Sequence, residues 1–230
     1  KSPKKDYIMY MKIKEGSFLK TLTEILKGCY KKGCLVFRKD GVSLDIADSK
    51  RELIVKLDLP EENFKYKYTY EKSQINFGVD FSDMYKQVKH TKKKENCVLY
   101  MERPIDNHPI VLKITEDKNN NGKASIKKLQ NISMQPIQCN MEEKYGKSML
   151  ADSKELQSAV KELKTLGIST IDFEVYERSL YWKTPEESMT SYEKLFGDDP
   201  DDDPIYTQRL SFMQLTPLLK ISGLSGNVKI

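Results

Sequence analysis

The clearest structural signal in the chain is Phe81-Ser82-Asp83-Met84-Tyr85-Lys86-Gln87-Val88-Lys89. Its apolar residues recur at the three- and four-residue spacing of one helix face, and Asp80 or Ser82 can cap the start of the helix. The pattern returns after 131 residues, which pairs Phe81 with Phe212, Met84 with Leu215, Val88 with Leu219 and Lys89 with Lys220. A pattern that recurs at a fixed spacing suggests an internal repeat.

A second pair of helices supports the repeat. Ser17 is expected to cap a helix that ends at Gly28, with an apolar stripe formed by Phe18, Leu19, Leu22, Ile25 and Leu26. Another capped helix is expected over Ser153–Leu166. A shift of 137 residues pairs Leu19 with Leu156, Leu22 with Ala159 and Leu26 with Leu163. Because the elements follow the same order in both halves, a duplication explains the agreement better than chance.

Alternating apolar and polar residues predict strands around these helices. In the first half, strands are expected at Tyr7–Lys14, Cys34–Phe37, Val42–Ile46, Glu52–Leu59, Phe64–Tyr70, Asn96–Glu102, Ile110–Thr115 and Ala124–Ile132. In the second half, they are expected at Tyr145–Leu150, Ser169–Val175 and Ser179–Lys183. Short turn signals such as Asp40-Gly41 join neighbouring strands, so the sheets are expected to be antiparallel. The predicted fold class is α+β.

The domain division follows from the segment 133–144, which loses the alternation and contains a proline, as a linker does. The prediction is an N-terminal domain at residues 1–132, an interdomain connector at 133–144 and a C-terminal domain at 145–230. The C-terminal domain is expected to lack its last strands, because a strand is only beginning at Asn227–Ile230. Asp198–Pro204 is expected to be a loop, since two prolines and five carboxylates disfavour pairing. Pro217 must lie in the first turn of its helix, which is therefore expected to start near Thr216.

Composition excludes several classes of protein. Hydrophobic residues make up 38% and charged residues 32%, which is typical of a soluble protein with much surface. No apolar run approaches the ~18–20 residues of a membrane span, and the first ten residues contain no signal-peptide core. We therefore expect no membrane association and no secretion. The four cysteines form no Cys-x-x-Cys pair, which argues against a disulfide framework or a zinc site and favours reduced thiols in the cytosol or nucleus.

Catalytic motifs are absent from the sequence. Of its two histidines, His90 lies beside a lysine run and His108 lies in a turn signal. There is no phosphate-binding glycine loop, no His-x-x-x-His pair and no nucleophile elbow. The prediction is therefore no catalytic residue, no metal site and no cofactor. A nucleic-acid-modifying enzyme whose carboxylates are brought together only by the fold stays as an alternative.

Basic residues are concentrated in the first part of the chain and on the predicted helices. The net charge is +5, but residues from Gly146 onward contain 10 basic and 14 acidic residues. The helical lysines are Lys20, Lys27, Lys86, Lys89, Lys161, Lys164 and Lys220, and Lys92–Lys94 follow the second helix directly. Lysines on solvated helix faces are the simplest interpretation. Their shared placement on four helices instead favours binding to phosphate backbones without sequence specificity.

The motifs together resemble the proliferating cell nuclear antigen family of DNA sliding clamps. The resemblance is carried by Gly16-Ser17-Phe18-Leu19-Lys20, by Gly41-Val42-Ser43-Leu44 followed by Asp48-Ser49, and by Phe77-Gly78-Val79-Asp80-Phe81-Ser82-Asp83-Met84. It runs from Tyr7 to Ile230 and depends on the order of elements more than on any single motif. It implies the DNA-clamp fold, with two duplicated domains, each with antiparallel sheets outside and two helices lining the inner face.

The resemblance also implies a function and partners. The family forms homotrimeric rings that encircle duplex DNA, raise DNA polymerase processivity and tether replication and repair enzymes without catalysis of their own. The expected partners are duplex DNA, a DNA polymerase, other proteins with clamp-binding peptides and a clamp loader. The expected location is the nucleus or another intracellular site of DNA replication. The alternative is a clamp-like scaffold in checkpoint or transcription roles that does not form a homotrimeric DNA ring.

Site residues can be assigned from the same resemblance. The expected DNA-binding residues are Lys20, Lys27, Lys86, Lys89, Lys92, Lys161, Lys164 and Lys220. The expected pocket for a partner peptide with a helical hydrophobic plug is formed by Ala47, Asp48, Met134, Pro136 and Ile137. Ordinary packing of a linker on a sheet would explain Met134 and Ile137 equally well. The chain departs from the family pattern at Ala47, which is small, and at Gln138-Cys139-Asn140.

Subunit contacts are expected between two edge strands, 124–132 and 187–195. The contact residues assigned to them are Ile126, Lys127, Lys128, Leu129, Tyr192 and Lys194. The first strand is positive and the second carries glutamates, so the two edges are complementary in charge. The alternative is that the lysines blunt both edges and prevent pairing.

Overall fold

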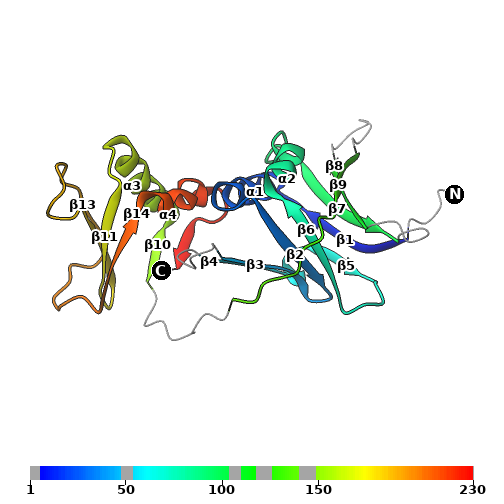
Figure 1. Cartoon of the computed structure of the whole chain (residues 1–230), viewed down its shortest axis with the longest axis horizontal. Helices are drawn as coiled ribbons and strands as arrows, with labels where there is room; N and C mark the ends of the chain where they lie inside the picture. Colours follow the sequence, from blue (N-terminus) through cyan, green and yellow to red (C-terminus); the bar gives the residue numbers. More distant parts are fainter. Residues whose placement is uncertain (1–5, 48–53, 104–109, 118–125, 140–148, 230) are drawn as a thin grey trace. The chain divides into compact units, whose positions relative to one another are not determined.

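The computed structural model describes residues 6–47, 54–103, 110–117, 126–139 and 149–229 (Figure 1). The chain folds into two compact units, unit 1 at Lys1–Asn140 and unit 2 at Met141–Ile230. No helix in the described ranges is long and apolar enough to cross a membrane. The four cysteines are free.

Unit 1 contains two antiparallel sheets and two α-helices. The five-stranded sheet has the order β5-β1-β7-β8-β9, with β5 at Lys65–Tyr68, β1 at Tyr7–Ile13, β7 at Asn96–Glu102, β8 at Val111–Asp117 and β9 at Ile126–Gln130. The four-stranded sheet has the order β4-β3-β2-β6, with β4 at Ile54–Pro60, β3 at Gly41–Ala47, β2 at Lys32–Arg38 and β6 at Gln74–Asp80. The helices are α1 at Gly16–Cys29 and α2 at Phe81–Val88, and the 3₁₀ turn η1 lies at Glu61–Asn63.

Unit 2 repeats most of this plan. Its four-stranded sheet has the order β13-β12-β11-β14, with β13 at Glu193–Gly197, β12 at Ser179–Lys183, β11 at Thr170–Val175 and β14 at Tyr206–Ser211. A separate pair is formed by β10 at Leu150–Asp152 and β15 at Asn227–Lys229. The helices are α3 at Ser153–Thr165 and α4 at Phe212–Leu215, which continues into the 3₁₀ helix η2 at Thr216–Gly223.

The two units correspond element by element. The order β4-β3-β2-β6 in unit 1 becomes β13-β12-β11-β14 in unit 2, and the β1–β7 pair becomes β10–β15. Residues that belong to the expected repeat are buried in both units. They are Leu19, Leu22, Leu26, Phe81 and Met84 in unit 1, and Leu156, Ala159, Leu163 and Leu215 in unit 2. The predicted α+β class and the duplicated clamp fold are therefore confirmed.

Local sequence explains where two of the helices begin. The carboxylate of Asp80 accepts hydrogen bonds from the backbone N–H groups of Ser82 and Asp83, at 2.9 and 3.2 Å, and so caps α2. Asp152 caps α3 in the same way, through Lys154 and Glu155 at 2.7 and 3.1 Å. In both cases a short acceptor side chain satisfies donors that the first helical turn leaves free.

The start of α1 corrects the sequence prediction. Ser17 lies inside the helix, and the N-cap is Glu15, whose side chain makes no capping hydrogen bond. The Gly16 N–H instead donates to the Glu95 carbonyl at 2.7 Å, and a Cβ at Gly16 would lie 2.2 Å from a methyl group of Thr91. The approach of the loop at 91–95 therefore sets this helix start.

The later part of unit 2 holds three further corrections. The last helix begins at Phe212 rather than near Thr216, and Pro217 lies in the first turn of η2. The strand expected at 187–195 is formed at Glu193–Gly197. Strands β6 and β14 were not expected. Strand β6 contains a glycine and runs directly into α2, while four of the six residues of β14 are exposed and Leu210 packs against the core. The segment Asp198–Pro204 forms no strand, as predicted.

The core of unit 2 surrounds Trp182, which is 1% exposed. Its ring lies 4.7 Å from Phe173 and 4.9 Å from Phe196, between centroids. Leu156, Leu163 and other residues of the apolar stripe of α3 belong to the same cluster. The helix that carries Lys161 and Lys164 is thus held on the sheet by one continuous apolar cluster.

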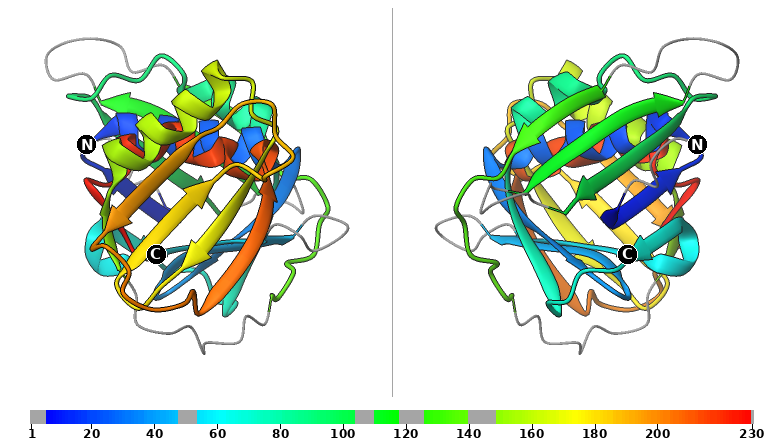
Figure 2. Two further views of the ribbon diagram at one scale, coloured as in Figure 1. Left: turned by 90° about the vertical axis from the view of Figure 1, so that its left-hand side faces the viewer. Right: turned by 90° about the vertical axis from the view of Figure 1, so that its right-hand side faces the viewer.

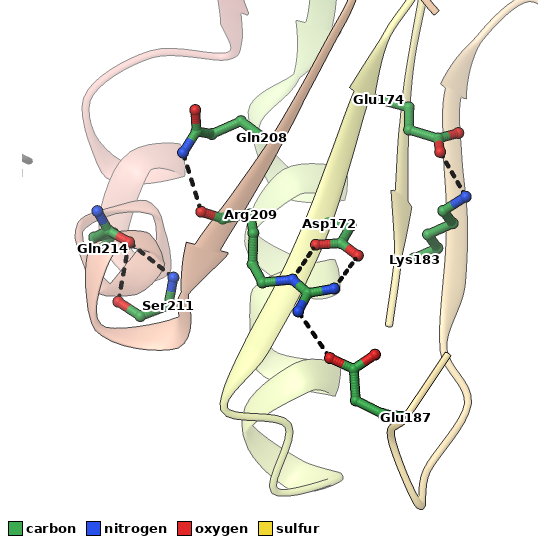
Figure 3. A network of polar contacts seen from close by, with 8 residues as sticks. All are labelled: Asp172, Glu174, Lys183, Glu187, Gln208, Arg209, Ser211 and Gln214. Atoms are coloured by element: carbon green, nitrogen blue, oxygen red, sulfur yellow. Dashed lines mark hydrogen bonds and ion pairs between the residues drawn. The ribbon is translucent and has the colours of Figure 1, made fainter. Parts of the chain in front are cut away.

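The opposite face of this sheet carries charges of alternating sign. Glu193 pairs across the strands with Lys183, Lys183 with Asp172, and Asp172 with Arg209. The Arg209 guanidinium donates two hydrogen bonds to Asp172, at 2.7 and 3.0 Å, and one to Glu187 at 2.8 Å (Figure 3). The hydrogen bonds from Arg209 lower the pKa of Asp172 despite its partial burial. Opposite charges facing each other across strands stabilise a sheet.

Candidate nucleic-acid interface and partner groove

The first group of expected DNA-binding lysines lies on two neighbouring helices of unit 1. Helices α1 and α2 pack side by side (Figure 1). Lys20 and Lys27 belong to α1, Lys86 belongs to α2, and Lys89 is its C-cap. The Lys27 ammonium lies 4.1 Å from the centre of the Tyr85 ring, so one of these lysines links the two helices. Lys27, Lys86 and Lys89 are exposed, and Lys20 is partly exposed.

Lys86 is partly engaged within its own helix. Its ammonium lies 2.8 Å from an Asp83 carboxylate oxygen, one helical turn away, and its side chain is 64% exposed. The hydrogen bond that the Lys86 ammonium donates to Asp83 raises the pKa of Lys86. An exposed ion pair of this kind contributes little to stability, so the ammonium can exchange Asp83 for a phosphate at small cost.

Lys92 lies in the loop that follows α2. Two hydrogen bonds within the loop fix its shape. The Glu95 N–H donates to the Lys92 carbonyl at 3.1 Å, and a Glu95 carboxylate oxygen accepts from the Lys92 N–H at 2.8 Å. Thr91 is buried and faces Gly16. Lys92, Lys93 and Lys94 are exposed, so the loop presents three consecutive ammonium groups from a fixed base.

The second group of expected DNA-binding lysines lies on the helices of unit 2. Lys161 and Lys164 are exposed on α3, and Lys220 is exposed on η2. The two helices are joined by the Gln157 side chain, which donates to the Leu219 carbonyl and accepts from the Ser222 hydroxyl at 2.7 Å. Each unit by itself therefore brings its own lysines together on a pair of packed helices.

The expected partner pocket corresponds to a groove on unit 1. The segment 131–139 follows the four-stranded sheet: Ile132 N–H donates to the Gly78 carbonyl at 2.9 Å, and Cys139 N–H donates to Asp45 at 3.0 Å. A Cβ at position 78 would lie 2.0 Å from the Ile132 carbonyl oxygen, so this close approach requires glycine. The segment and the sheet enclose a groove of about 570 Å³.

Only part of the expected pocket lines this groove. Pro136 and Ile137 line it, and Ile137 is 51% exposed. Ala47, at the end of β3, and Met134, whose carbonyl oxygen lies 3.7 Å from the Cys34 sulfur, do not line it. Asp48 lies outside the described residues. The structure thus unites two of the five expected pocket residues in one cavity.

The groove is lined by polar side chains that sequence reasoning missed. The Arg38 guanidinium donates to Gln74 at 3.1 Å and to Ser43 at 3.0 Å, which fixes it on the groove wall. The remaining charged residues of the lining are Asp40, Asp45, Lys56 and Asp58. Asp40 lies in the turn between β2 and β3, whereas Asp45 belongs to β3 and Lys56 and Asp58 belong to β4. The sequence signal of the three strand residues was only a polar position in an alternating pattern. This groove can offer both an apolar edge and charged hydrogen-bonding groups to a partner.

The relatives of the chain identify its family. Residues 8–137 match the family described as "Proliferating cell nuclear antigen, N-terminal domain". The chain belongs to the proliferating cell nuclear antigen family. Among solved structures it is similar to the proliferating cellular nuclear antigen of Entamoeba histolytica, with a TM-score of 0.78 and 17% identity, over 97% of this chain and 88% of that chain. The structural likeness confirms the clamp fold. A comparison with curated proteins gave no significant match.

Subunit contacts were expected from the sequence at two sheet edges. Strand β9 is an edge of the five-stranded sheet and β13 is an edge of the sheet in unit 2. Ile126 is 52% exposed, and Lys128 is exposed beside it, whereas Lys127 donates to the Gln87 carbonyl of α2. Lys194 forms an ion pair with Glu155 at 3.1 Å.

Two of the expected contact residues are buried within their own units. Leu129 is 6% exposed and belongs to the core of unit 1. Tyr192 is 9% exposed, and its hydroxyl donates to Glu162 at 3.2 Å. Burial raises the pKa of Tyr192. The alternating pattern placed both on a strand but did not tell which face the core would cover.

The described ranges also contain clustered acidic side chains. Within these ranges, no three His, Cys, Asp or Glu side chains are arranged to hold a metal ion. The five carboxylates of Asp198–Asp203 lie around an open depression with Tyr176 and Arg178.

Proposed function

We propose that this member of the proliferating cell nuclear antigen family is a sliding clamp that encircles duplex DNA as a homotrimer and tethers a DNA polymerase and repair enzymes to it. The proposal rests above all on one observation: each of the two duplicated units carries exposed lysines on a pair of packed helices. In a ring built from such units, the helix pairs line the central hole. The DNA-binding residues are then Lys20, Lys27, Lys86, Lys89, Lys92, Lys161, Lys164 and Lys220.

The chemistry of lysine suits sliding. Each ammonium is a strongly hydrated point charge on a flexible stem, so it attracts phosphates of any sequence without fixed geometry. Binding is driven by counterion release, and neighbouring phosphates offer equivalent positions along the duplex. The ring therefore stays on DNA by topology and moves along it at little energetic cost.

The biochemical role follows from tethering rather than from catalysis. A polymerase held by a clamp that cannot leave its template rebinds at a high effective concentration, which raises processivity. In this proposal the protein has no enzymatic activity, and it needs a clamp loader to open the ring. It acts in the nucleus or at another intracellular site of DNA replication.

The test of the ring is retention on closed DNA. The protein is loaded on nicked circular duplex with a clamp loader, washed at 0.5 M salt, and the circle is then cut once. We expect the clamp to stay on the circle and to leave after cutting, and a native mass of three chains. Retention that does not change on cutting would mean ordinary binding and would overturn the ring. A monomeric mass under the same conditions would favour a clamp-like scaffold.

The partner groove gives a separate prediction. Replacing Ile137 with serine removes an apolar side chain from the groove edge, so a fluorescent peptide with a helical hydrophobic plug should bind about tenfold more weakly, as expected when one buried aliphatic contact is lost. Fluorescence polarisation measures the change. Ile205→Ser is the matched control, because Ile205 is 71% exposed and lies in unit 2. If both variants bind the peptide like the unmodified protein, the groove is not the docking site.

A further inference from the structure

The five-stranded sheet of unit 1 is visible as a ribbon in Figure 2 (right). The pairing of its strands places an unusual row of side chains on its outer face, away from its buried residues. Residues that pair directly across antiparallel strands point to the same face. One such row crosses the five strands and reads Lys67, Tyr10, Tyr100, Lys113 and Lys128. The next row reads Lys65, Lys12, Val98, Thr115 and Ile126. The face therefore presents five lysines and the rings of β1 and β7.

Two pairs of like charge face each other within these rows. Lys12 lies opposite Lys65, and Lys113 lies opposite Lys128. Like charges directly opposite each other destabilise a sheet. Among the described residues, Glu102 pairs with Lys113, whereas Lys65, Lys67 and Lys128 form no ion pair. Folding alone does not favour this arrangement.

Unit 2 provides the internal comparison. The outer row of its sheet alternates in sign, from Glu193 through Lys183 and Asp172 to Arg209. Figure 3 shows the last three of these residues. Opposite charges therefore face each other in that sheet, whereas like charges face each other in the five-stranded sheet. The chain therefore neutralises the outer face of the sheet in unit 2 with its own side chains. On the positive face of unit 1, a ligand would supply the negative charge that the chain does not.

Aromatic rings lie between the lysines. The centroids of Tyr7 and Tyr10 are 5.7 Å apart, and those of Tyr7 and Tyr100 are 5.2 Å apart. Tyr100 is buried beneath the cluster, while Tyr7 and Tyr10 are partly exposed. The Lys113 ammonium lies 5.9 Å from the centre of the Tyr100 ring. Lys65 and Lys67 flank the cluster on one side and Lys128 on the other, across about 19 Å at the usual strand spacing of ~4.8 Å.

We propose that this outer face, formed by Lys65, Lys67, Tyr10, Lys113 and Lys128, binds single-stranded nucleic acid. Phosphates would pair with the lysines on both sides, and an unpaired base would stack on the exposed part of the tyrosine cluster, as bases do on other aromatic sheet surfaces. A duplex keeps its bases stacked inside and cannot use the rings. The surface is separate from the lysines of α1 and α2, so its ligand is additional to the encircled duplex.

The test uses Lys65→Gln/Lys67→Gln/Lys128→Gln and a fluorescent 20-residue oligothymidylate. Fluorescence polarisation should show at least tenfold weaker binding at 0.1 M salt, and the slope of log K against log salt should fall by about 2, at ~0.7 per lost contact with a single strand. The matched control is Lys31→Gln/Lys39→Gln/Lys229→Gln, which removes three exposed lysines outside this face. The control should bind the oligonucleotide like the unmodified protein.

Stacking is tested at Tyr10. Tyr10→Leu should weaken oligothymidylate binding roughly tenfold, whereas Tyr10→Phe, which keeps the ring, should retain it. Circular dichroism checks that both variants fold. Unchanged affinity of the lysine variant, an equal loss in its control, no difference between Leu and Phe at Tyr10, or equally strong competition by poly-glutamate would each overturn the proposal. Tyr10→Leu should leave retention on circular duplex unaffected, which separates this surface from the proposed clamp function.

Discussion

Replacing Lys86 and Lys89 together with glutamate is expected to reduce affinity for duplex DNA at least about a hundredfold at 0.15 M salt. Both side chains are exposed at the end of α2, and charge reversal turns phosphate attraction into repulsion. In a homotrimer the double variant changes six positions. The slope of log K against log salt should therefore fall by about 5, at ~0.9 per phosphate contact. Equilibrium binding to a sequence-neutral duplex at several salt concentrations measures both quantities.

The double variant should still fold. Lys86 pairs only with Asp83 one turn away, and both side chains are mostly exposed, so the lost ion pair was worth little. The control is Lys39→Glu/Lys72→Glu, which reverses two exposed charges in loops that connect strands. It should lower affinity only slightly through the change in net charge. Equal losses in the two variants, or an unchanged slope in the first, would mean that Lys86 and Lys89 do not face DNA.

The sequence predicted the helices well because their information is local. The spacing of Phe81, Met84 and Val88 defines a stripe that is buried in the structure, and Asp80 provides the cap beside it. The repeat added a second, independent reason to trust the pattern. The start of α1 could not be predicted in this way, since it depends on the contact between Gly16 and Thr91, which are far apart in the sequence.

Strands without an apolar face were missed for a physical reason. Four of the six residues of β14 are exposed, so the strand shows no alternation of buried and exposed residues. It is held by backbone pairing to β11 and by the Arg209–Asp172 hydrogen bonds. Such a strand depends on its partner. Pattern rules detect burial, and they fail where pairing and charge replace burial.

The candidate site also contains residues that local sequence predicts and residues that only the fold brings together. Lysines on helices could be assigned from spacing, because a helix face is defined within a few turns. The groove could not, because its wall combines Arg38, Ser43 and Asp58 from three strands with the segment at 136–139. Which side of β9 and β13 is buried was equally hidden, as Leu129 and Tyr192 illustrate. Sites assembled from several strands need the fold first.

The largest effect on stability is expected at Trp182, the one tryptophan of the chain. Trp182→Ala should lower the free energy of unfolding by about 3–5 kcal/mol, because it empties a site that is 1% exposed and packed between two phenylalanine rings. Since α3 rests on the same cluster, Lys161 and Lys164 should lose their fixed positions as well. Urea denaturation followed by circular dichroism measures the change. Met189→Ala is the control, because Met189 is fully exposed and should have no effect.

Trp182→Phe should cost much less than Trp182→Ala, for a reason beyond volume. The indole N–H is buried and has no hydrogen-bond acceptor among the described residues. A buried donor without a partner costs about 1–3 kcal/mol, and phenylalanine removes that donor while keeping a ring between Phe173 and Phe196. The gain from losing the N–H therefore offsets part of the lost packing. If phenylalanine destabilises unit 2 as much as alanine does, the N–H must bind an acceptor such as a buried water, and the tryptophan is held by that hydrogen bond rather than by its packing alone.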